Sequence, residues 1–398
     1  MWAWEPVAAL LLSVCALSLA ASAVSHVLLW CVVRRERQPS QPSAAPPERV
    51  AILKPLCGVE ADLAENLANF AQQTHRELGL VFGVADARDE VSSLARQFCD
   101  AHPELDTRLS IGEAPGLLNP KVALLTRMSR FEHADWLVVS DSNVRVAPDY
   151  VARALSHAAP DVGLITHLVA GDGGHSLAAR LENLQLNCFI APAVCAARFI
   201  AGRTCVIGKS MFLRRELLEK LGGFGSAGGF LAEDYVLGQA VERAGYRVAT
   251  VATPVRAWHA GWTWSRFVNR HLRWAVMRRR ISRPAYVAEP LLLPATFLLP
   301  LLALALWRPE LGINPAWLVL SLLLEAALAA ITFTRMTGQR APLLTVAVNP
   351  LRQVLTFGIW VTGWFIHHID WRGKVYRVGP NSVLWPVRPL SERVPDEA

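Results

Sequence analysis

The sequence predicts an α/β domain with a mostly parallel sheet and helices on both faces, joined to a membrane by apolar helices at both ends. From Val50 onward, short β-rich runs alternate with helical stretches, which is the order that parallel sheets produce. The segment Pro6–Val33 contains no Asp, Glu, Lys or Arg, and about 20 apolar residues are enough to cross a bilayer. The chain of 398 residues is 53% hydrophobic and 18% charged, so it is more apolar than a typical soluble protein.

Residues 1–37 are predicted to form an N-terminal membrane anchor. Glu5 precedes the apolar stretch, whereas Arg34, Arg35 and Arg37 follow it. A cleaved signal peptide carries its basic residues before the apolar run, so this order favours an anchor that is retained. The positive-inside rule then places the N-terminus outside and the following chain in the cytoplasm, on the inner face of the cell (inner) membrane.

Residues 38–48 form a Pro/Ser-rich linker, and residues 49–260 are expected to form one cytoplasmic domain. Its predicted strands are Val50–Leu53, Leu78–Val84, Arg108–Ile111, Trp136–Ser140 and Val162–Thr166. Its predicted helices are Ala61–Gln73, Val91–Ala101, Pro120–Phe131 and Tyr235–Ala244.

Residues 261–285 are predicted to form an interfacial helix, and residues 286–370 are predicted to form membrane helices. Pro290–Trp307 and Pro315–Phe333 are long enough for a helical hairpin across the bilayer. Four arginines precede this hairpin and mark the cytoplasmic side: Arg278, Arg279, Arg280 and Arg283. The chain is therefore expected to cross the membrane more than once.

The apolar segment Leu343–His368 allows two interpretations. It contains Pro350 and Arg352, and a full crossing would place the basic residues after it outside, against the positive-inside rule. A re-entrant or interfacial segment is the alternative, with residues 371–398 as a cytoplasmic tail. Glu325, inside the second hairpin helix, either serves the function or faces a neighbouring helix.

Charge and cysteine content narrow the classes of partner. The net charge is +7, but no basic and aromatic nucleic-acid module is present, so an anionic small molecule and a membrane are expected, and no nucleic acid. The seven cysteines include no Cys-x-x-Cys pair, which argues against a disulfide framework or a zinc site.

Acidic residues follow two of the predicted strands. Asp86 follows Leu78–Val84, and Asp141 ends Trp136–Ser140 with Asn143 two residues on. Ligands of open α/β sheets bind beyond the carboxyl ends of the strands. Asp141 and Asn143 are therefore candidate metal ligands, since Mg²⁺ typically takes one or two carboxylates together with phosphates. The alternative is that these residues only cap helices or form turns.

A further acidic pair, Glu233-Asp234, precedes the predicted helix Tyr235–Ala244 and follows the glycine-rich run 222–229. A glycine-rich loop before an acid is typical of a mobile lid, and one of the two acids could be a general base. The alternative is compensation of the helix dipole by acids in the first turn.

The predicted helix Trp264–Ile281 carries Arg270, Arg273 and Trp274. The two arginines are three residues apart and share a face, and arginine binds diphosphates through its fork of donors. Trp274 could line an acceptor pocket. The same residues are also typical of an interfacial amphipathic helix. His259 is a weaker candidate for a metal ligand.

Taken in order, these motifs resemble inverting glycosyltransferases of families 2 and 21, which carry three aspartates and a (Gln/Arg)-x-x-Arg-Trp motif. The matching residues are Asp86, Asp141-Ser-Asn143, Glu233-Asp234 and Arg270-His-Leu-Arg273-Trp274. Further runs are similar to the ceramide glucosyltransferase branch, in its bacterial type: Leu53-Lys-Pro-Leu-Cys-Gly58, Asn119-Pro-Lys121, Asp141-Ser-Asn-Val-Arg-Val146 and Leu231-Ala-Glu-Asp-Tyr-Val-Leu-Gly238. The resemblance covers about residues 50–285.

The resemblance implies the nucleotide-sugar-binding fold called GT-A and transfer of glucose from UDP-glucose, with inversion, to ceramide. Asp234 would be the base, and Arg270, Arg273 and Trp274 would serve donor phosphates and acceptor. The donor would be bound by Lys54, Asp86, Lys121, Asp141 and Glu233. Mg²⁺ or Mn²⁺ would be held at Asp141 and Asn143, although many relatives in the wider superfamily have Asp where this chain has Asn143.

Other functions remain open at this point. Glycosyltransferases that modify hopanoid lipids share these motifs, with N-acetylglucosamine or a similar sugar. A processive polysaccharide synthase carries the arginine motif too, but it needs more membrane helices for a polymer channel. A transporter or membrane scaffold would explain the apolar helices but not the acids at the strand ends.

Overall fold

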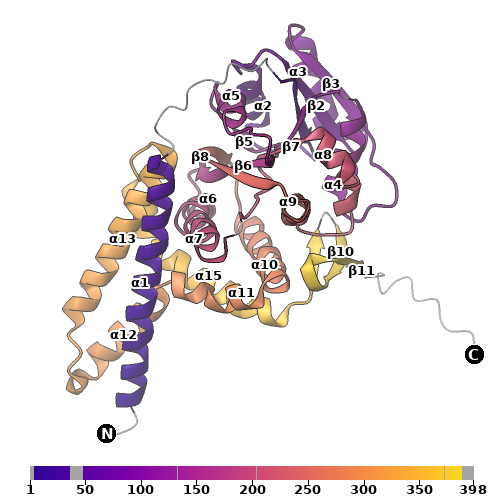
Figure 1. The fold of residues 1–398 in the computed structure, drawn as a ribbon. Helices are drawn as coiled ribbons and strands as arrows, with labels where there is room; N and C mark the ends of the chain where they lie inside the picture. Colours follow the sequence, from indigo (N-terminus) through magenta and orange to yellow (C-terminus); the bar gives the residue numbers. More distant parts are fainter. Residues whose placement is uncertain (1–3, 36–47, 132, 203, 372, 388–398) are drawn as a thin grey trace, which may run out of the picture.

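The computed structural model describes residues 4–35, 48–131, 133–202, 204–371 and 373–387. Figure 1 shows an α/β domain, a bundle of long helices that extends away from it, and a layer of helices beneath it that ends in a small sheet. The predicted linker lies outside the described residues except for Glu48.

The α/β domain is built on an eight-stranded sheet with the order β3-β2-β1-β4-β7-β6-β8-β5. Its strands are β1 (Val50–Pro55), β2 (Leu78–Val84), β3 (Asp106–Ile111), β4 (Trp136–Val139), β5 (Val144–Arg145), β6 (Val162–Asp172), β7 (Met211–Arg214) and β8 (Arg247–Trp258). The first four in the order are parallel, and β6 is parallel to β8. β7 is antiparallel to both its neighbours, and β5 is antiparallel to β8. The predicted parallel-dominated sheet is confirmed, whereas β7 and β8 are not among the predicted strands.

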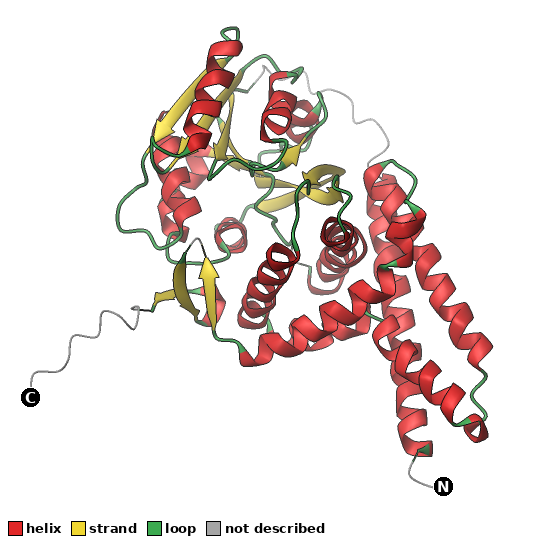
Figure 2. Cartoon of the chain, turned by 180° about the vertical axis from the view of Figure 1, so that it is seen from behind, coloured by secondary structure: helices red, strands yellow, loops and turns green. Residues whose placement is uncertain are grey.

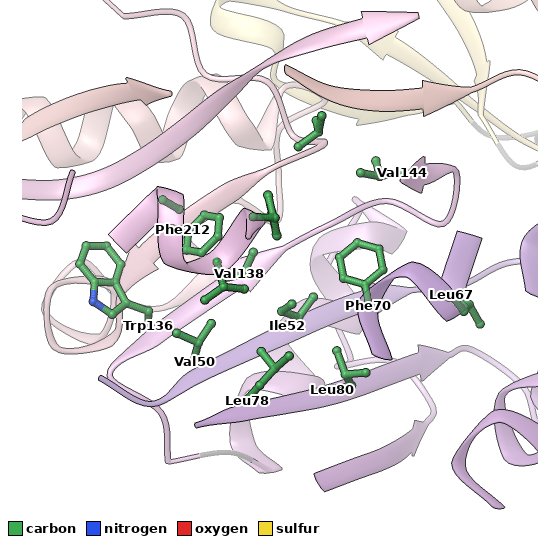
Figure 3. Close-up of a cluster of buried hydrophobic side chains, with 14 of the residues drawn as sticks. Val50, Ile52, Leu67, Phe70, Leu78, Leu80, Trp136, Val138, Val144 and Phe212 are labelled. Carbon is green, nitrogen blue, oxygen red and sulfur yellow. The ribbon is translucent and has the colours of Figure 1, made fainter. Parts of the chain in front are cut away.

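Helices cover both faces of this sheet because both faces of its central strands are apolar. In β1, Val50 and Ile52 join one buried cluster, and Ala51 and Leu53 join the other. The first cluster, shown in part in Figure 3, includes residues of α2 (Leu63–Ala71), α3 (Glu90–Ala101) and α5 (Tyr150–Leu155). The second includes residues of α4 (Pro120–Met128), α8 (Arg215–Lys220) and α9 (Glu233–Arg243). A strand buried on both sides is expected of a parallel sheet.

The helical bundle contains α1 (Glu5–Arg35), α12 (Ala295–Trp307) and α13 (Pro315–Thr337). Trp4 and Trp307 pack edge to face with ring centroids 5.5 Å apart, and Arg335 lies over the Trp30 ring at 4.5 Å. The start of α1 therefore lies beside the α12–α13 connection, and its other end lies beside the end of α13. This is the arrangement that the predicted anchor and hairpin require.

By length and composition, three described helices could cross a membrane: α1, α13 and the run Leu177–Ala201. The last comprises α6 (Leu177–Gln185) and α7 (Ala191–Ala201), and it is half buried beside β6. α12 makes a fourth candidate with the segment Arg283–Leu292, which contains α11 (Arg283–Ala288), although the two are bent by 49°.

The segment Leu343–His368 does not leave the α/β domain. It forms α14 (Leu343–Ala347) and α15 (Asn349–Phe365). At its start, Arg180 of α6 donates a hydrogen bond to Thr345 at 2.9 Å, and the chain after its end packs back onto the α/β domain. Figures 1 and 2 show α15 running across the direction of α1. The interfacial interpretation stays a prediction.

Polar residues of α15 point inward, and part of its apolar residues are exposed on the opposite face. Arg352, Gln353 and Thr356 are buried, and Gln353 donates to Glu325 of α13 at 3.4 Å. Glu325 thus faces a neighbouring helix. Exposed apolar residues recur three to seven positions apart along the opposite face: Leu351, Val354, Val361 and Phe365. A helix with this distribution is suited to lie on a membrane surface.

The last described residues correct the expectation of a plain cytoplasmic tail after residue 370. Strands β9 (His368–Trp371), β10 (Lys374–Val378) and β11 (Leu384–Pro386) form an antiparallel sheet. It holds the two residues that precede α9, because Leu231 N donates to Ser382 O at 2.8 Å and Ala232 N donates to the Ser382 hydroxyl at 3.1 Å. A mobile lid stays a prediction for the glycine-rich run 222–229.

Replacing Ser382 with alanine tests this contact. Ser382 is fully buried, so Ser382→Ala leaves the Ala232 N–H without its partner and should lower stability by about 1–3 kcal/mol. The measurement is the thermal transition of the detergent-solubilised protein. Ser226→Ala is the control, since this exposed hydroxyl bonds only within its own turn, and it should change stability by less than about 0.5 kcal/mol. If Ser382→Ala and wild type unfold at the same temperature, Ser382 does not stabilise this contact.

Candidate active site

Three of the predicted site residues lie at one edge of the sheet. β1, β2 and β4 are parallel, so Lys54 near the end of β1, Asp86 after β2 and Asp141 after β4 share the carboxyl edge. Asp86 is half exposed and pairs with Arg88 at 2.7 Å, and hydrogen bonds from Arg88 lower the pKa of Asp86 to about 2. A ligand at this edge would meet a permanently charged Asp86.

Lys54 was expected to contact the donor, but it is completely buried. Its ammonium donates to the backbone oxygen of Asp141 at 2.9 Å and to the Ser140 hydroxyl at 3.2 Å, and lies 3.7 Å from the centre of the Phe70 ring. In this arrangement Lys54 fixes the turn that carries Asp141.

Two lysines form ion pairs with the carboxylate of Asp141. Lys121 Nζ lies 2.8 Å from Oδ1, and Lys209 Nζ lies 3.3 Å from Oδ2. Burial alone would raise the pKa of Asp141, but the charges of the two lysines lower it. Burial lowers the pKa of Lys209 to about 8. Lys209 also donates to Asn143 Oδ1 at 2.7 Å, so one ammonium joins both predicted metal ligands.

Lys209 lies there because of the strand register. β7 is antiparallel to β4 and pairs Met211 with Val139, so two residues further along the same register Lys209 stands opposite Asp141. Asn143 is held in turn by the end of β8, since its amide donates to Trp258 O at 3.0 Å. Sequence reasoning missed Lys209 because the residues that follow it were not recognised as a strand.

The two acids at the start of α9 differ in burial and in their contacts. Glu233 is buried, and its Oε1 lies 3.0 Å from Lys121 Nζ. Asp234 is only partly buried, and its carboxylate accepts from Gly208 N at 2.7 Å and from Tyr235 N at 2.8 Å. Burial and the charge of Glu233 raise the pKa of Asp234 to about 7. Asp234 is thus the acid with both partial access and a pKa suited to accept a proton near neutral pH.

Gly208 lies close to both Lys121 and Asp234, so a larger residue here would press on their side chains. A Cβ at this position would lie 3.0 Å from Lys121 Nζ and 3.1 Å from Asp234 Oδ2. The Gly208 carbonyl also accepts from Lys121 at 3.1 Å. The backbone of the Gly208-Lys209 segment therefore links the Asp141 end of the site to the Asp234 end.

The site fits a divalent ion only with help from a ligand. Among the residues that the structure describes, no three His, Cys, Asp or Glu side chains form a group that could hold a metal ion. Asp141 and Asn143 nevertheless aim oxygen atoms at one point, now taken by the Lys209 ammonium. One carboxylate and one amide oxygen completed by phosphates is a set that Mg²⁺ accepts.

The arginine motif lies on α10 (Trp264–Ile281) and is held by a buried glutamate of α6. Glu182 Oε1 lies 3.5 Å from Arg270 Nη1, and Glu182 Oε2 lies 2.6 Å from His271 Nε2. Although burial would raise the pKa of Glu182, the charges of Arg270 and His271 lower it. Arg270 also lies over the rings of Trp274 at 4.3 Å and Trp262 at 5.2 Å. Its guanidinium is therefore fixed in position.

The other members of the motif face different surroundings. Arg273 lies over Trp371 of the C-terminal sheet at 5.9 Å, and Trp274 packs against the first buried cluster. His259 is fully buried and bonds Asn183 Oδ1 at 2.7 Å, with its other ring nitrogen 4.0 Å from Glu182. These contacts place His259 in the support of Arg270. Glu182 was also missed, although a single acid inside the apolar run Leu177–Ala201 is a detectable signal.

Comparison with known proteins identifies the sequence family that this chain matches and two similar proteins. The sequence model described as glycosyl transferase family 21 matches residues 10–384. The chain is 25% identical over 246 residues to ceramide glucosyltransferase 1 of Caenorhabditis elegans, covering 61% of this chain and 52% of that protein. It is 26% identical over 250 residues to ceramide glucosyltransferase 3 of the same organism, covering 61% and 53%. The chain spans about half the length of these relatives.

Solved structures provide a further comparison. A mannosyltransferase from Pyrobaculum calidifontis in complex with GDP-Man and Mn²⁺ aligns with 88% of this chain and 98% of its own, at a TM-score of 0.47 and 19% sequence identity.

Removing the buried counter-charge of Arg270 should destabilise the protein strongly. Glu182→Ala leaves Arg270 and His271 without their partner, and such a loss lowers stability by about 3–5 kcal/mol. The thermal transition in detergent measures it. Glu219→Ala, which removes an exposed pair with Arg215, should change stability by less than about 1 kcal/mol. Similar small effects of both substitutions would show that Glu182 is not the anchor of the motif.

Proposed function

The chain belongs to glycosyl transferase family 21, and from this premise we propose that it moves glucose from UDP-glucose to the primary hydroxyl of ceramide, with inversion at the anomeric carbon. It is a glycosyltransferase, and the ceramide glucosyltransferases among its relatives support a lipid acceptor. Donor, acceptor and stereochemistry are the proposed part.

The observation that carries the proposal is the contact of Lys121 with both halves of the site. Its ammonium lies 2.8 Å from Asp141 and 3.0 Å from Glu233, and it also donates to the carbonyl of Gly208. Asp141 is the candidate for the donor diphosphate, and Asp234, next to Glu233, is the candidate base. Lys121 therefore supports the view that the base and the leaving group act in one site.

The proposed reaction is a single displacement. Asp234 accepts the proton of the acceptor hydroxyl while that oxygen forms a bond to the anomeric carbon of glucose. The bond from this carbon to the phosphate oxygen breaks at the same time, and its electron pair leaves with UDP. Because the two oxygens lie on opposite faces of the carbon, an α-linked donor gives a β-linked product.

The charge that develops on the departing diphosphate must be stabilised. Lys121 and Lys209 supply two ammonium groups beside Asp141. The ion pair with Glu182 fixes the guanidinium of Arg270. Charge-assisted hydrogen bonds to phosphate are shorter and stronger than neutral ones. We propose that Arg270 and Arg273 bind the diphosphate and that Trp274 lines the acceptor pocket. A divalent ion at Asp141 and Asn143, when bound, would neutralise further phosphate charge.

Asp86 is the proposed partner of the nucleotide. It stands at the same sheet edge as Asp141, two strands away, and it is exposed enough to accept hydrogen bonds from a base or ribose.

A lipid acceptor fits the surface beside the site. α10, which carries the arginine motif, packs against α15, whose outer face exposes apolar residues. Figure 1 shows both helices beneath the α/β domain, and α15 also contacts α12 of the helical bundle. A catalytic domain that rests on the membrane in this way could receive the hydroxyl of a lipid without removing the lipid from the bilayer. We propose the cytoplasmic leaflet of the cell membrane, following the predicted orientation of α1.

Transfer by wild type and by Asp234→Asn tests the proposal. Purified protein is incubated with labelled UDP-glucose, Mg²⁺ or Mn²⁺ and ceramide, and the lipid products are resolved by mass spectrometry. Wild type should form hexosylceramide, and Asp234→Asn should lose at least about 100-fold in rate because general-base catalysis contributes that much. Asp161→Asn, an exposed aspartate paired with Arg247, is the matched control and should keep full activity.

The outcomes separate the alternatives. If UDP is released only with a hopanoid or another lipid, the enzyme class stands and the ceramide assignment fails. A polymer in place of a glycolipid would indicate a processive synthase. Absence of UDP release with every acceptor would contradict the proposal as a whole.

The pH dependence of the wild-type rate tests the same base independently. Asp234, whose pKa is raised to about 7, accepts a proton only when it is ionised. We expect kcat/KM to rise with pH through about 7 and to fall by about tenfold per pH unit below it. An ordinary aspartate would give a constant rate down to about pH 5. A profile that stays constant between about pH 5 and about pH 8 would contradict a base whose pKa is raised to about 7.

A further inference from the structure

We propose that the Lys209 ammonium and a divalent cation are alternative occupants of one position between Asp141 and Asn143, so that Lys209 weakens metal binding and sets how much metal the enzyme needs. The inference rests on the proposed function in one respect: the metal is the one expected with a nucleotide-sugar donor.

The first argument is the geometry of the two oxygen atoms. Asp141 Oδ2 and Asn143 Oδ1 both face Lys209 Nζ, at 3.3 Å and 2.7 Å. These are the oxygens that a metal at this site would use. An ion bound to them would lie a few ångströms from the ammonium in a largely enclosed site, where like charges repel strongly. Both cations cannot stay there together.

The second argument is that the backbone of Lys209 is fixed whereas its long side chain has several rotamers. Gly208 N is bonded to Asp234, and Ser210 O accepts from the Thr166 hydroxyl at 2.9 Å. The strand register with β4 then keeps the Cα of Lys209 beside Asp141. The side chain has four rotatable bonds. Metal entry therefore requires that the buried ammonium turns away from the two oxygen atoms, and a donor phosphate would be a new partner for it.

The third argument is the charge of the ligands. Asp141 brings one negative charge, Asn143 brings none, and the other oxygen of Asp141 already faces Lys121. Affinity for divalent ions depends on the number of charged ligands. A site with one shared carboxylate suits a single positive charge such as that of Lys209. It should hold a divalent ion well only when phosphates add their charge.

The test is Mn²⁺ binding to the full chain in detergent, without nucleotide or lipid, followed by electron paramagnetic resonance of free Mn²⁺. Lys209→Met removes the competing charge and should tighten binding by about tenfold or more, because a like charge this close opposes the ion. Lys209→Arg keeps the charge and should show no such gain. Lys220→Met, which removes an exposed lysine paired with Glu216, is the matched control and should bind as wild type.

Two further variants locate the effect. Asp141→Asn combined with Lys209→Met should lose the gain, because the ion then lacks its only carboxylate. Asn143→Asp leaves Lys209 in place and should also tighten Mn²⁺ binding, which keeps the test decisive if Lys209→Met does not fold.

Equal Mn²⁺ affinity of wild type and folded Lys209→Met would overturn the inference, as would a gain that survives Asp141→Asn. Should Lys209→Met not fold, unchanged affinity in Asn143→Asp would overturn it. The binding measurement contains no sugar donor or acceptor. Failure to form a glycolipid would therefore contradict the proposed function without affecting the Mn²⁺ result. Equal Mn²⁺ affinities would contradict the inference about Lys209 without affecting the proposed function.

Discussion

The site depends on one buried ammonium group, that of Lys121, which contacts three parts of the chain at once. It binds the carboxylate of Asp141 after β4, the carboxylate of Glu233 at the start of α9 and the carbonyl of Gly208 before β7. Burial lowers the pKa of Lys121, but the charges of Asp141 and Glu233 outweigh it and raise the pKa. Removing this charge would leave the buried carboxylate of Glu233 and the partly buried carboxylate of Asp141 without their shared counter-charge. The distance between the proposed leaving group and base is thus set by Lys121.

Two further contacts fix the position of Arg270 and of the residues before α9. Glu182 fixes Arg270 from α6, and the C-terminal sheet fixes the residues just before α9 through Ser382. Both contacts involve the layer that carries α10 and α15, which packs beneath the α/β domain. The layer of α10, α15 and the C-terminal sheet therefore positions Arg270 and the start of α9, which are the groups that the proposed reaction uses.

Local patterns predicted much of this from the sequence, and long-range pairing accounts for what was missed. The long uncharged run predicted α1. The parallel strands with Asp86 and Asp141 at their ends were predicted from the alternation of short β-rich runs with helical stretches. β7 was missed because its four residues, Met211–Arg214, are too few for a clear pattern of alternation. Lys209 was missed for the same reason, since its position beside Asp141 follows from the pairing of β7 with β4. The C-terminal sheet pairs with residues about 150 positions earlier, as Ser382 does with Ala232, and no local pattern encodes such a contact.

The central claim is a single displacement with Asp234 as base, and the anomeric configuration of the product tests it most directly. The measurement is proton NMR of the glycolipid that wild type makes from UDP-glucose and ceramide. A β-linked glucose on the primary hydroxyl is the predicted result. An α-linked glucose would contradict the account, because retention requires a different mechanism from direct attack by the acceptor.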